Sequence, residues 1–280
     1  MTLPEAGEPD LERRFGGLKR LWGAGPYEAV RSCRVAVVGL GGVGSWAAEA
    51  LARCGVAELV LIDLDHVAES NINRQIQALD STLGMAKVQA VQARVAQIHP
   101  GCRVHAVEEF VEPQNWPQVL PSPVDVVIDA CDQAAAKFTL ACWALDGGTP
   151  LVTVGAAGGK CAPERVEVAD LADVTHDPML ARLRQRLRRQ VEHALPVGQV
   201  PKSGHEPGHV KVTPRRAANT AGRLGVTCVF SREEIQRPDA GCSVEGSLNC
   251  AGYGSSVMVT ATFGMVAAEQ ALAWVRRRAV

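Results

Sequence analysis

The chain has 280 residues, with 29 Lys and Arg against 30 Asp and Glu, so its net charge is −1 when histidine is neutral. This balance excludes a wholly basic nucleic-acid coat protein and an acidic disordered chain. Because 47% of the residues are apolar and 21% are charged, the chain can bury a large core. The length suits one large α/β domain or two small ones.

The nine cysteines have no Cys-x-x-Cys spacing of the kind that structural zinc sites and redox pairs use. Residues 1–10 contain neither the basic region nor the apolar run of a signal peptide. We therefore expect reduced thiols, no structural zinc and a cytoplasmic protein.

The first half of the chain alternates short apolar runs with helical patterns, which is typical of parallel βαβ units. Right-handed crossovers then predict a Rossmann-like α/β fold, with a doubly wound, mostly parallel sheet, helices on both faces and a C-terminal crossover insertion. We expect an N-terminal helical arm (1–31), a Rossmann-like core (32–160) and a C-terminal part (161–280) that completes the same domain. The predicted strands are 34–38, 58–63, 103–107, 124–129, 151–154 and 224–230, and the predicted helices are 44–53, 86–98, 134–145 and 182–191.

Residues 257–268 are almost continuously apolar and end at Glu269. A membrane-spanning helix needs about 20 such residues. We therefore predict a buried core helix and no membrane span, with a membrane anchor as the alternative.

A glycine-rich motif, Gly-Leu-Gly-Gly-Val-Gly, lies between the first predicted strand and helix; its glycines are Gly39, Gly41, Gly42 and Gly44. In this context it predicts a nucleotide site, because the backbone can approach a phosphate and a helix N-terminus attracts negative charge. Asp63 ends the next strand, where an acidic side chain commonly accepts hydrogen bonds from ribose. The motif alone fits NAD, FAD or ATP, and a glycine turn without a ligand is the alternative.

The segment after Asp63 favours a triphosphate over a dinucleotide. Arg74 can grip phosphate oxygens with its planar guanidinium, and Lys87 can act on them as a point charge. A solvated helix face is the alternative for Lys87 taken alone. The other polar residues of this cluster are Asp65, Asn71, Asn73 and Gln75.

Asp132 follows a predicted strand at its carboxyl end, which is the edge of an open sheet where ligands bind. Mg²⁺ takes few protein ligands and completes its shell with phosphate and water, so Asp132 is the predicted metal ligand. Asp129 is expected to cap or brace the loop. The alternative for Asp132 is an N-cap of the helix that begins at 134.

Together, Gly-Leu-Gly-Gly-Val-Gly, Asp-Leu-Asp, Asn-Ile-Asn-Arg-Gln, Lys87 and Asp-Ala-Cys-Asp resemble the adenylation site of ubiquitin-activating-like enzymes, over residues 11–160. That group includes the thiamine- and molybdopterin-pathway adenylyltransferases. The resemblance implies an ATP-binding core in which MgATP is bound by the cluster above, Asp132 holds the metal and a substrate carboxylate attacks the α-phosphate. Arg74, Lys87 and Asp132 are therefore the expected catalytic residues.

The chain departs from the sulfur-carrier activators of this family in two ways. It lacks their two zinc-binding Cys-x-x-Cys pairs, and Gly17 replaces the second arginine of their N-terminal helix. These departures, together with Arg14-Phe15-Gly16-Gly17, Ser45-Trp46-Ala47-Ala48-Glu49 and the segments 224–231 and 259–264, resemble one branch, the tRNA threonylcarbamoyladenosine dehydratases.

This closer resemblance implies an ATP-dependent ligase-class reaction. Threonylcarbamoyladenosine at tRNA position 37 would be cyclised, with net dehydration, to a hydantoin through an acyl-adenylate. The resemblance also implies a homodimer and sulfur-mobilising (cysteine desulfurase-type) protein partners.

Two other functions stay open at this point. One is an adenylyltransferase that activates the C-terminal glycine of a ubiquitin-like sulfur-carrier protein, and the other is a nucleotide-binding scaffold without activity. Cys228 is either an acyl-shuttling thiolate or, in the ordinary case, a buried cysteine on an apolar strand.

Charge is unevenly distributed along the chain. Residues 182–223 contain ten Lys and Arg against two Glu, a net charge of +8, which leaves −9 for the rest. This predicts a salt-sensitive contact with RNA phosphates, in which a basic mobile loop near 192–223 orders on a tRNA stem-loop. The alternative is a solvated helix face and a disordered loop. The expected RNA-binding residues are Arg188, Arg189, Lys202, Lys211, Arg215 and Arg216.

Overall fold

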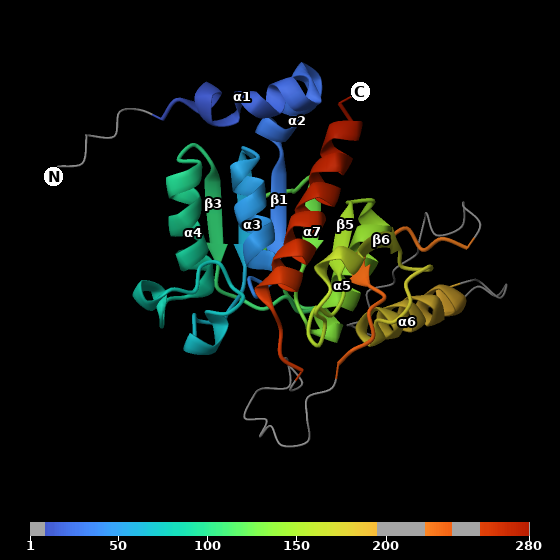
Figure 1. Ribbon diagram of the computed structural model, residues 1–280. Helices are drawn as coiled ribbons and strands as arrows, with labels where there is room; N and C mark the ends of the chain where they lie inside the picture. Colours follow the sequence, from blue (N-terminus) through green and yellow to red (C-terminus); the bar gives the residue numbers. More distant parts are fainter. Residues whose placement is uncertain (1–8, 195–221, 237–252, 280) are drawn as a thin grey trace.

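The computed structural model describes residues 9–194, 222–236 and 253–279 (Figure 1). Four of the expected RNA-binding residues lie outside this part of the chain: Lys202, Lys211, Arg215 and Arg216. The expected loop near 192–223 falls almost wholly outside it as well.

A seven-stranded sheet organises the described residues, in the order β3-β2-β1-β4-β5-β7-β6. All neighbouring strands are parallel except β6 and β7, which are antiparallel. The chain reverses its direction of travel across the sheet between β3 and β4, so β1 and β4 lie side by side at a topological switch point, where open α/β sheets bind ligands. The strands are β1 (Arg34–Val38), β2 (Glu58–Ile62), β3 (Arg103–Val107), β4 (Val126–Asp129), β5 (Leu151–Val154), β6 (Val166–Asp170) and β7 (Thr227–Ser231).

Apolar residues of the central strands alternate between two cores, as the two-residue period of a strand requires. Val35 and Val37 pack into one core and Ala36 and Val38 into the other. The first core is covered by α3 (Gly44–Arg53), α4 (Lys87–Ile98) and α7 (Val257–Arg277), and the second by α5 (Ala134–Gly147) and α6 (Pro178–Ala194). Three short 3-10 helices, Glu69–Asn71, Asp80–Thr82 and Pro163–Arg165, lie in the connections.

Two N-terminal helices, α1 (Leu11–Trp22) and α2 (Ala24–Ser32), lie across the amino ends of the strands, at the top of Figure 1. Phe15 of α1 is buried and meets the His99 ring edge-on, with centroids 4.8 Å apart. Arg14 donates a hydrogen bond of 2.6 Å to the Ile98 carbonyl at the end of α4. The first predicted part of the chain is thus helical and packed on the sheet domain.

Among the described residues, α7 is the helix that is long and apolar enough to cross a membrane. Its residues Val259, Phe263, Ala267 and Ala271 are fully buried in the first core. A Cβ on Gly264 would come within 2.4 Å of the Val43 carbonyl oxygen, so α7 packs very closely on the start of α3. In this structure the apolar segment 257–268 is packed in the core as predicted. The helix continues beyond it to Arg277.

Most predicted elements coincide with the observed ones to within a few residues, and the predicted fold class is confirmed. Strand β6 was not predicted, because its residues are half-buried or exposed at the sheet edge and show no apolar run. Helix α6 begins at Pro178, four residues earlier than predicted. The division of the chain at residues 31 and 160 stays a prediction, although β6 and β7 complete the same sheet as β1 to β5.

Seven of the nine cysteines lie in the described residues, and all seven are free thiols. Cys228 is fully buried on β7, and burial raises the pKa of its thiol. Because a thiol with a raised pKa is a poor nucleophile, the structure favours the ordinary alternative of a buried core cysteine.

His99 supports a prediction about pH. It is buried, and Arg31 donates to its Nε2 at 2.7 Å; because a guanidinium can only donate, Nε2 must accept and the ring is neutral. Burial, followed by the charges of Arg31 and Arg14, lowers its pKa from 6.5 to about 4.

Between these pH values the unfolded chain binds a proton that folded His99 does not. The free energy of unfolding should therefore fall as the pH decreases from 6.5 to about 4. In His99→Gln, urea unfolding at several pH values should show a flatter dependence over this range. The exposed control, His66→Gln, should keep the wild-type dependence, and an equal slope in all three proteins would contradict the prediction.

Candidate active site

The glycine-rich loop connects β1 to α3 at the carboxyl edge of the sheet. Gly39 has a φ of +85°, and a Cβ there would come within 2.9 Å of the Cys131 backbone. A Cβ on Gly44 would lie 1.8 Å from the Gly39 carbonyl oxygen, so these two positions accept no side chain. A Cβ on Gly41, by contrast, would meet nothing within 4 Å. Gly39 and Gly44 therefore shape the turn, while Gly41 leaves open space beside the backbone.

The start of α3 can bind an anion. Val43 occupies the N-cap position, and its side chain offers no acceptor to the first N–H groups of the helix. Such N–H groups and the helix dipole attract phosphate. Gly42 lies against Arg74 and Thr260, since a Cβ there would come within 3.2 Å of both side chains. The loop is thus bordered by the aliphatic stem of Arg74 and by the Cβ and methyl group of Thr260 from α7.

Asp63 lies just beyond β2, next to this loop. Its Oδ2 accepts a hydrogen bond of 2.5 Å from the Leu40 N–H, and its Oδ1 accepts one of 2.8 Å from the Asp65 N–H. Burial raises the pKa of Asp63, while the Lys87 charge and both backbone N–H groups act in the opposite direction. Each carboxylate oxygen can accept a second hydrogen bond, so Asp63 can both hold the loop and accept from a ribose hydroxyl.

The two expected cations both come after Asp63: Arg74 lies within the segment that follows it, and Lys87 begins α4 at the end of that segment. Lys87 is buried at the start of α4, and its Nζ lies 2.7 Å from Oδ2 of the exposed Asp65. Arg74 donates to the Ser70 carbonyl at 2.6 Å and to Asn73 Oδ1 at 2.9 Å, and Trp46 of α3 holds the Arg74 carbonyl at 3.0 Å. The Lys87 ammonium is thus held by a side chain from outside its helix, while the Arg74 guanidinium bonds residues of its own segment and Trp46 anchors the Arg74 backbone.

The amides of the cluster have different roles. Asn73 donates to the Ser255 carbonyl at 2.9 Å, which links this segment to the start of α7. Asn71 is buried and accepts from the Ala68 N–H, so it holds its own turn. Gln75 is buried and accepts a hydrogen bond of 3.0 Å from Gln77. Of the three, Asn71 and Gln75 are structural in this conformation.

The carboxyl end of β4 carries a buried ion pair. Lys137 of α5 and Asp129 are almost completely buried, and the Lys137 Nζ lies 3.1 Å from both carboxylate oxygens. Lys137 also donates to the Val154 carbonyl at 2.8 Å, and Thr153 donates to Asp129. Although burial acts in the opposite direction, the Asp129 charge raises the pKa of Lys137, so the ammonium stays charged. Asp129 is therefore the predicted brace, which joins β4, β5 and α5.

Asp132 is exposed in the loop that this brace supports. Neighbouring atoms nevertheless desolvate it enough to raise its pKa, with a smaller contribution in the same direction from Asp65. Gln133, and not Asp132, occupies the N-cap position of α5. The N-cap alternative for Asp132 is therefore wrong, and its carboxylate is available at the sheet edge.

Three polar side chains at the loop were missed by sequence reasoning. Ser45 Oγ, Gln77 Oε1 and Thr260 Oγ1 are buried and have no hydrogen-bond partner among the described residues. All three residues adjoin the glycine-rich loop: Ser45 follows it, Gln77 donates to the Leu40 carbonyl at 2.9 Å, and Thr260 lies against Gly42 through its Cβ and methyl group. Buried polar groups without a partner are costly, so their gathering here fits a site that binds a polar ligand.

In the sequence, Ser45 and Thr260 stand only in segments that carry the family resemblance, with nothing to mark them as site residues. Gln77 stands two positions after Gln75 in the same polar run. Thr260 belongs to a segment that reads as a core helix, and its position beside Gly42 depends on how α7 packs.

Comparisons with known proteins agree with this geometry. Residues 16–279 match the ThiF family. The chain belongs to that family. It is 40% identical over 270 residues to the tRNA threonylcarbamoyladenosine dehydratase of Escherichia coli K12, covering 93% of this chain and 92% of that one. It is 35% identical to the enzyme of the same name from Haemophilus influenzae, covering 94% and 93%.

Solved structures of the E. coli dehydratase extend the likeness to three dimensions. The complex with ATP is 38% identical, covers 98% of both chains and has a TM-score of 0.79. The complex with AMP has a TM-score of 0.80 at the same identity and covers 98% of this chain and 99% of that one. As a ThiF-family member, the chain therefore shares sequence and fold over nearly its whole length with an enzyme that has been seen with both nucleotides.

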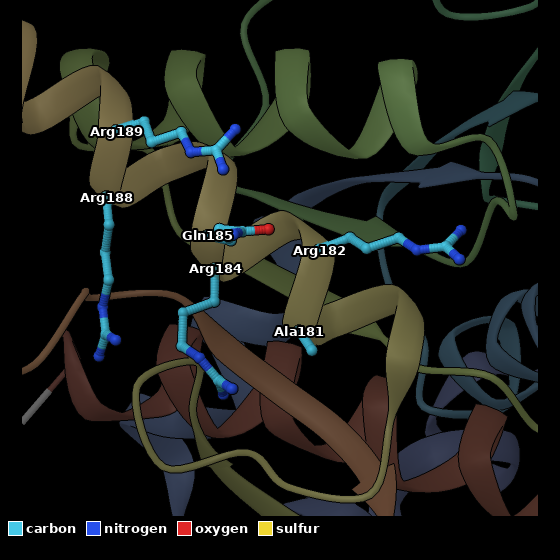
Figure 2. Close-up of a pocket in the computed structure, with 6 residues that line it drawn as sticks. All are labelled: Ala181, Arg182, Arg184, Gln185, Arg188 and Arg189. Carbon is cyan, nitrogen blue, oxygen red and sulfur yellow. The ribbon is translucent and has the colours of Figure 1, made fainter.

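The two expected RNA-binding residues in the described part are exposed on α6. Figure 2 shows that Arg188 and Arg189 leave the helix in different directions. Their contact with RNA stays a prediction.

The Lys137–Asp129 pair generates a prediction about stability. Lys137→Met removes one partner and leaves a buried carboxylate uncompensated, which should lower the free energy of unfolding by about 3–5 kcal/mol. Urea denaturation at pH 7 measures this loss. The exposed Lys19→Met should change the stability by no more than about 0.5 kcal/mol, and a loss that small in Lys137→Met would contradict the role of the brace.

Proposed function

We propose that this ThiF-family chain is an ATP-dependent tRNA threonylcarbamoyladenosine dehydratase. The observation that carries the proposal is the gathering of Arg74, Lys87 and Asp132 around an anion-binding glycine loop at one sheet edge. Relatives that share more than 90% of its length bear that name.

The proposed reaction has two steps. The threonyl carboxylate of the modified adenosine attacks the α-phosphate of ATP, which forms an acyl-adenylate and releases pyrophosphate. A nitrogen of the same side chain then attacks the activated carbonyl, which expels AMP and closes a hydantoin ring. The base loses one water in total. Because ring closure is intramolecular, no protein nucleophile is needed, which agrees with the burial of Cys228.

Each group of residues has a proposed part in this reaction. The loop at Gly39, Gly41, Gly42 and Gly44 and the start of α3 bind phosphates, and Asp63 accepts from the ribose. Arg74 and Lys87 neutralise charge that develops on the phosphates, which is the main source of catalysis expected in such a site. Asn73 positions Arg74, while Asn71, Gln75 and Asp65 hold the segment and Lys87 in place.

A magnesium ion fits this arrangement. Mg²⁺ is commonly bound by one or two carboxylates together with phosphate oxygens and water. Asp132 offers an exposed carboxylate, and Asp65 is close enough to raise its pKa. Within the described residues no cluster of three or more His, Cys, Asp and Glu could bind a metal by itself. Asp132 would therefore hold a magnesium ion that supplies charge neutralisation to the bound triphosphate.

One assay tests the function. The protein is incubated with ATP, Mg²⁺ and tRNA bearing threonylcarbamoyladenosine, and AMP and the mass of the base are measured. We expect AMP together with a base lighter by one water, and neither product without Mg²⁺. AMP that appears only with a ubiquitin-like sulfur-carrier protein would establish the alternative adenylyltransferase. ATP binding without cleavage under either condition would leave a scaffold.

The role of the cations is tested by substitution. Arg74→Ala and Lys87→Ala should each lower the rate of AMP release at least about a hundredfold, the usual cost of removing a group that stabilises transition-state charge. Arg53→Ala, at an exposed position on α3, is the control and should retain the wild-type rate. Activity within a few fold of wild type in the first two variants would remove their phosphate role.

We also propose a homodimer. The segment after β2 exposes five large apolar side chains: Leu64, Ile72, Leu79, Leu83 and Met85. A segment that exposes several large apolar side chains favours an interface. Light scattering should give the mass of two chains, and Leu79→Glu with Leu83→Glu should give one; a wild-type monomer would refute the dimer. Association with sulfur-mobilising proteins and a cytoplasmic location stay predictions.

A further inference from the structure

A positively charged stripe lies on α6, beside the proposed active site. Arg182, Arg186 and Arg189 are exposed and spaced by four and three residues, so they lie on one side of the helix. The helical rise separates the first from the last by about 10 Å. We call these three residues the arginine stripe.

The stripe is electrostatically unbalanced. The thirteen residues from Pro178 to Gln190 include five arginines and no acidic residue. Among the described residues, no carboxylate forms an ion pair with Arg182, Arg186 or Arg189. Of the two arginines outside the stripe, Arg184 and Arg188, Arg184 donates to the Leu171 and Val174 carbonyls. The stripe therefore carries positive charge that no described side chain neutralises.

The surface around the stripe is open. Arg182, Arg184, Arg188 and Arg189 line a hollow of about 560 Å³, and Figure 2 shows Arg182 and Arg189 extending to the same side, away from Arg184 and Arg188. Arg186 stacks over the Phe138 ring of α5 at 3.8 Å, which fixes its guanidinium while leaving it exposed. A stacked guanidinium keeps its donors free in a plane, the geometry that suits a phosphate.

The stripe starts at the edge of the sheet that carries the active site. Asp177, the residue before α6, accepts a hydrogen bond of 2.8 Å from Ala156 N–H, just beyond β5. Arg182 lines a small cavity with Ala134, which is two residues after Asp132. Further along, Arg186 meets Phe138, and the Gln190 Oε1 meets Cys142 Sγ at 3.3 Å. The stripe therefore runs from beside Asp132 away along α5.

We propose that the arginine stripe binds the phosphate backbone of the substrate tRNA while its modified base occupies the active site. This inference rests on the proposed function. The stripe would supply the salt-dependent contacts with RNA phosphates. Neither the glycine-rich loop nor Asp132 supplies such contacts.

The chemistry of α6 favours RNA over a membrane surface. Leu180, Leu183 and Leu187 are buried in the second core, and none of the exposed large apolar side chains among the described residues belongs to α6. A membrane-binding helix needs an exposed apolar face to insert. Unpaired guanidinium groups without such a face suit a hydrated polyanion.

The test uses the double variant Arg182→Gln and Arg189→Gln, which removes two exposed charges but no described hydrogen bond, ion pair or ring contact. Its affinity for tRNA bearing threonylcarbamoyladenosine, measured by fluorescence anisotropy at about 0.1 M salt, should fall about tenfold. The slope of log Kd against log salt should decrease by about 1.5–2, as expected for two lost phosphate contacts. The KM for tRNA should rise while kcat and ATP affinity stay within twofold of wild type.

The matched control is Arg20→Gln with Arg277→Gln. It removes the same charge from exposed positions on α1 and at the last residue of α7; α1 and the C-terminal end of α7 lie at the opposite end of the sheet (Figure 1). Its tRNA affinity and salt slope should stay close to wild type, and both double variants should unfold at the wild-type temperature.

The outcomes separate the inference from the proposed function. If the wild type cyclises the base and the stripe variant binds tRNA as tightly as wild type, the inference is overturned and the proposed function stands. If the control variant weakens as much as the stripe variant, binding follows net charge and the stripe has no special role. If the wild-type protein neither binds nor modifies the tRNA, the proposed function itself fails.

Discussion

The ammonium group of Lys137 lies between two parallel strands and a helix, where water does not reach it. It bonds the Asp129 carboxylate at the end of β4 and the Val154 carbonyl at the end of β5, while its own backbone belongs to α5. A buried charge is tolerated only when it is paired and hydrogen-bonded, so these three elements must meet in one geometry. The loop with Asp132, the path of α5 and, through α5, the position of α6 all follow from that constraint.

Around this brace, the sheet edge collects segments that are far apart in the chain. The glycine-rich loop comes from the β1–α3 connection, Arg74 and Lys87 from the segment after β2, and Thr260 from α7. Hydrogen bonds from Trp46 to the Arg74 carbonyl and from Asn73 to the Ser255 carbonyl tie these segments together. The result is a preorganised set of donors and cations, which is what charge stabilisation during adenylation requires.

The positive charges near the site form two groups, one at the nucleotide end and one on α6. The nucleotide end of the site uses two cations held by neighbouring groups, Lys87 by Asp65 and Arg74 by Asn73 and Ser70. The arginines of α6 lie beside it and, apart from Arg184, make no described hydrogen bond or ion pair through their guanidinium groups. The near-zero net charge of the chain therefore hides a local concentration of positive charge next to the catalytic edge.

Local patterns in the sequence predicted six of the seven strands, the glycine-rich loop and the candidate residues Arg74, Lys87 and Asp132, because each depends on short-range spacing: apolar alternation, glycines between a strand and a helix, or polar residues after a strand. Strand β6 escaped prediction because an edge strand with polar residues has no such pattern. The unpartnered Ser45, Gln77 and Thr260, the pairing of Lys137 with Asp129 and the placement of the α6 arginines beside the sheet edge were decided by the tertiary structure alone. They arise where residues from separate segments are packed together, and a one-dimensional pattern does not record which buried groups become neighbours.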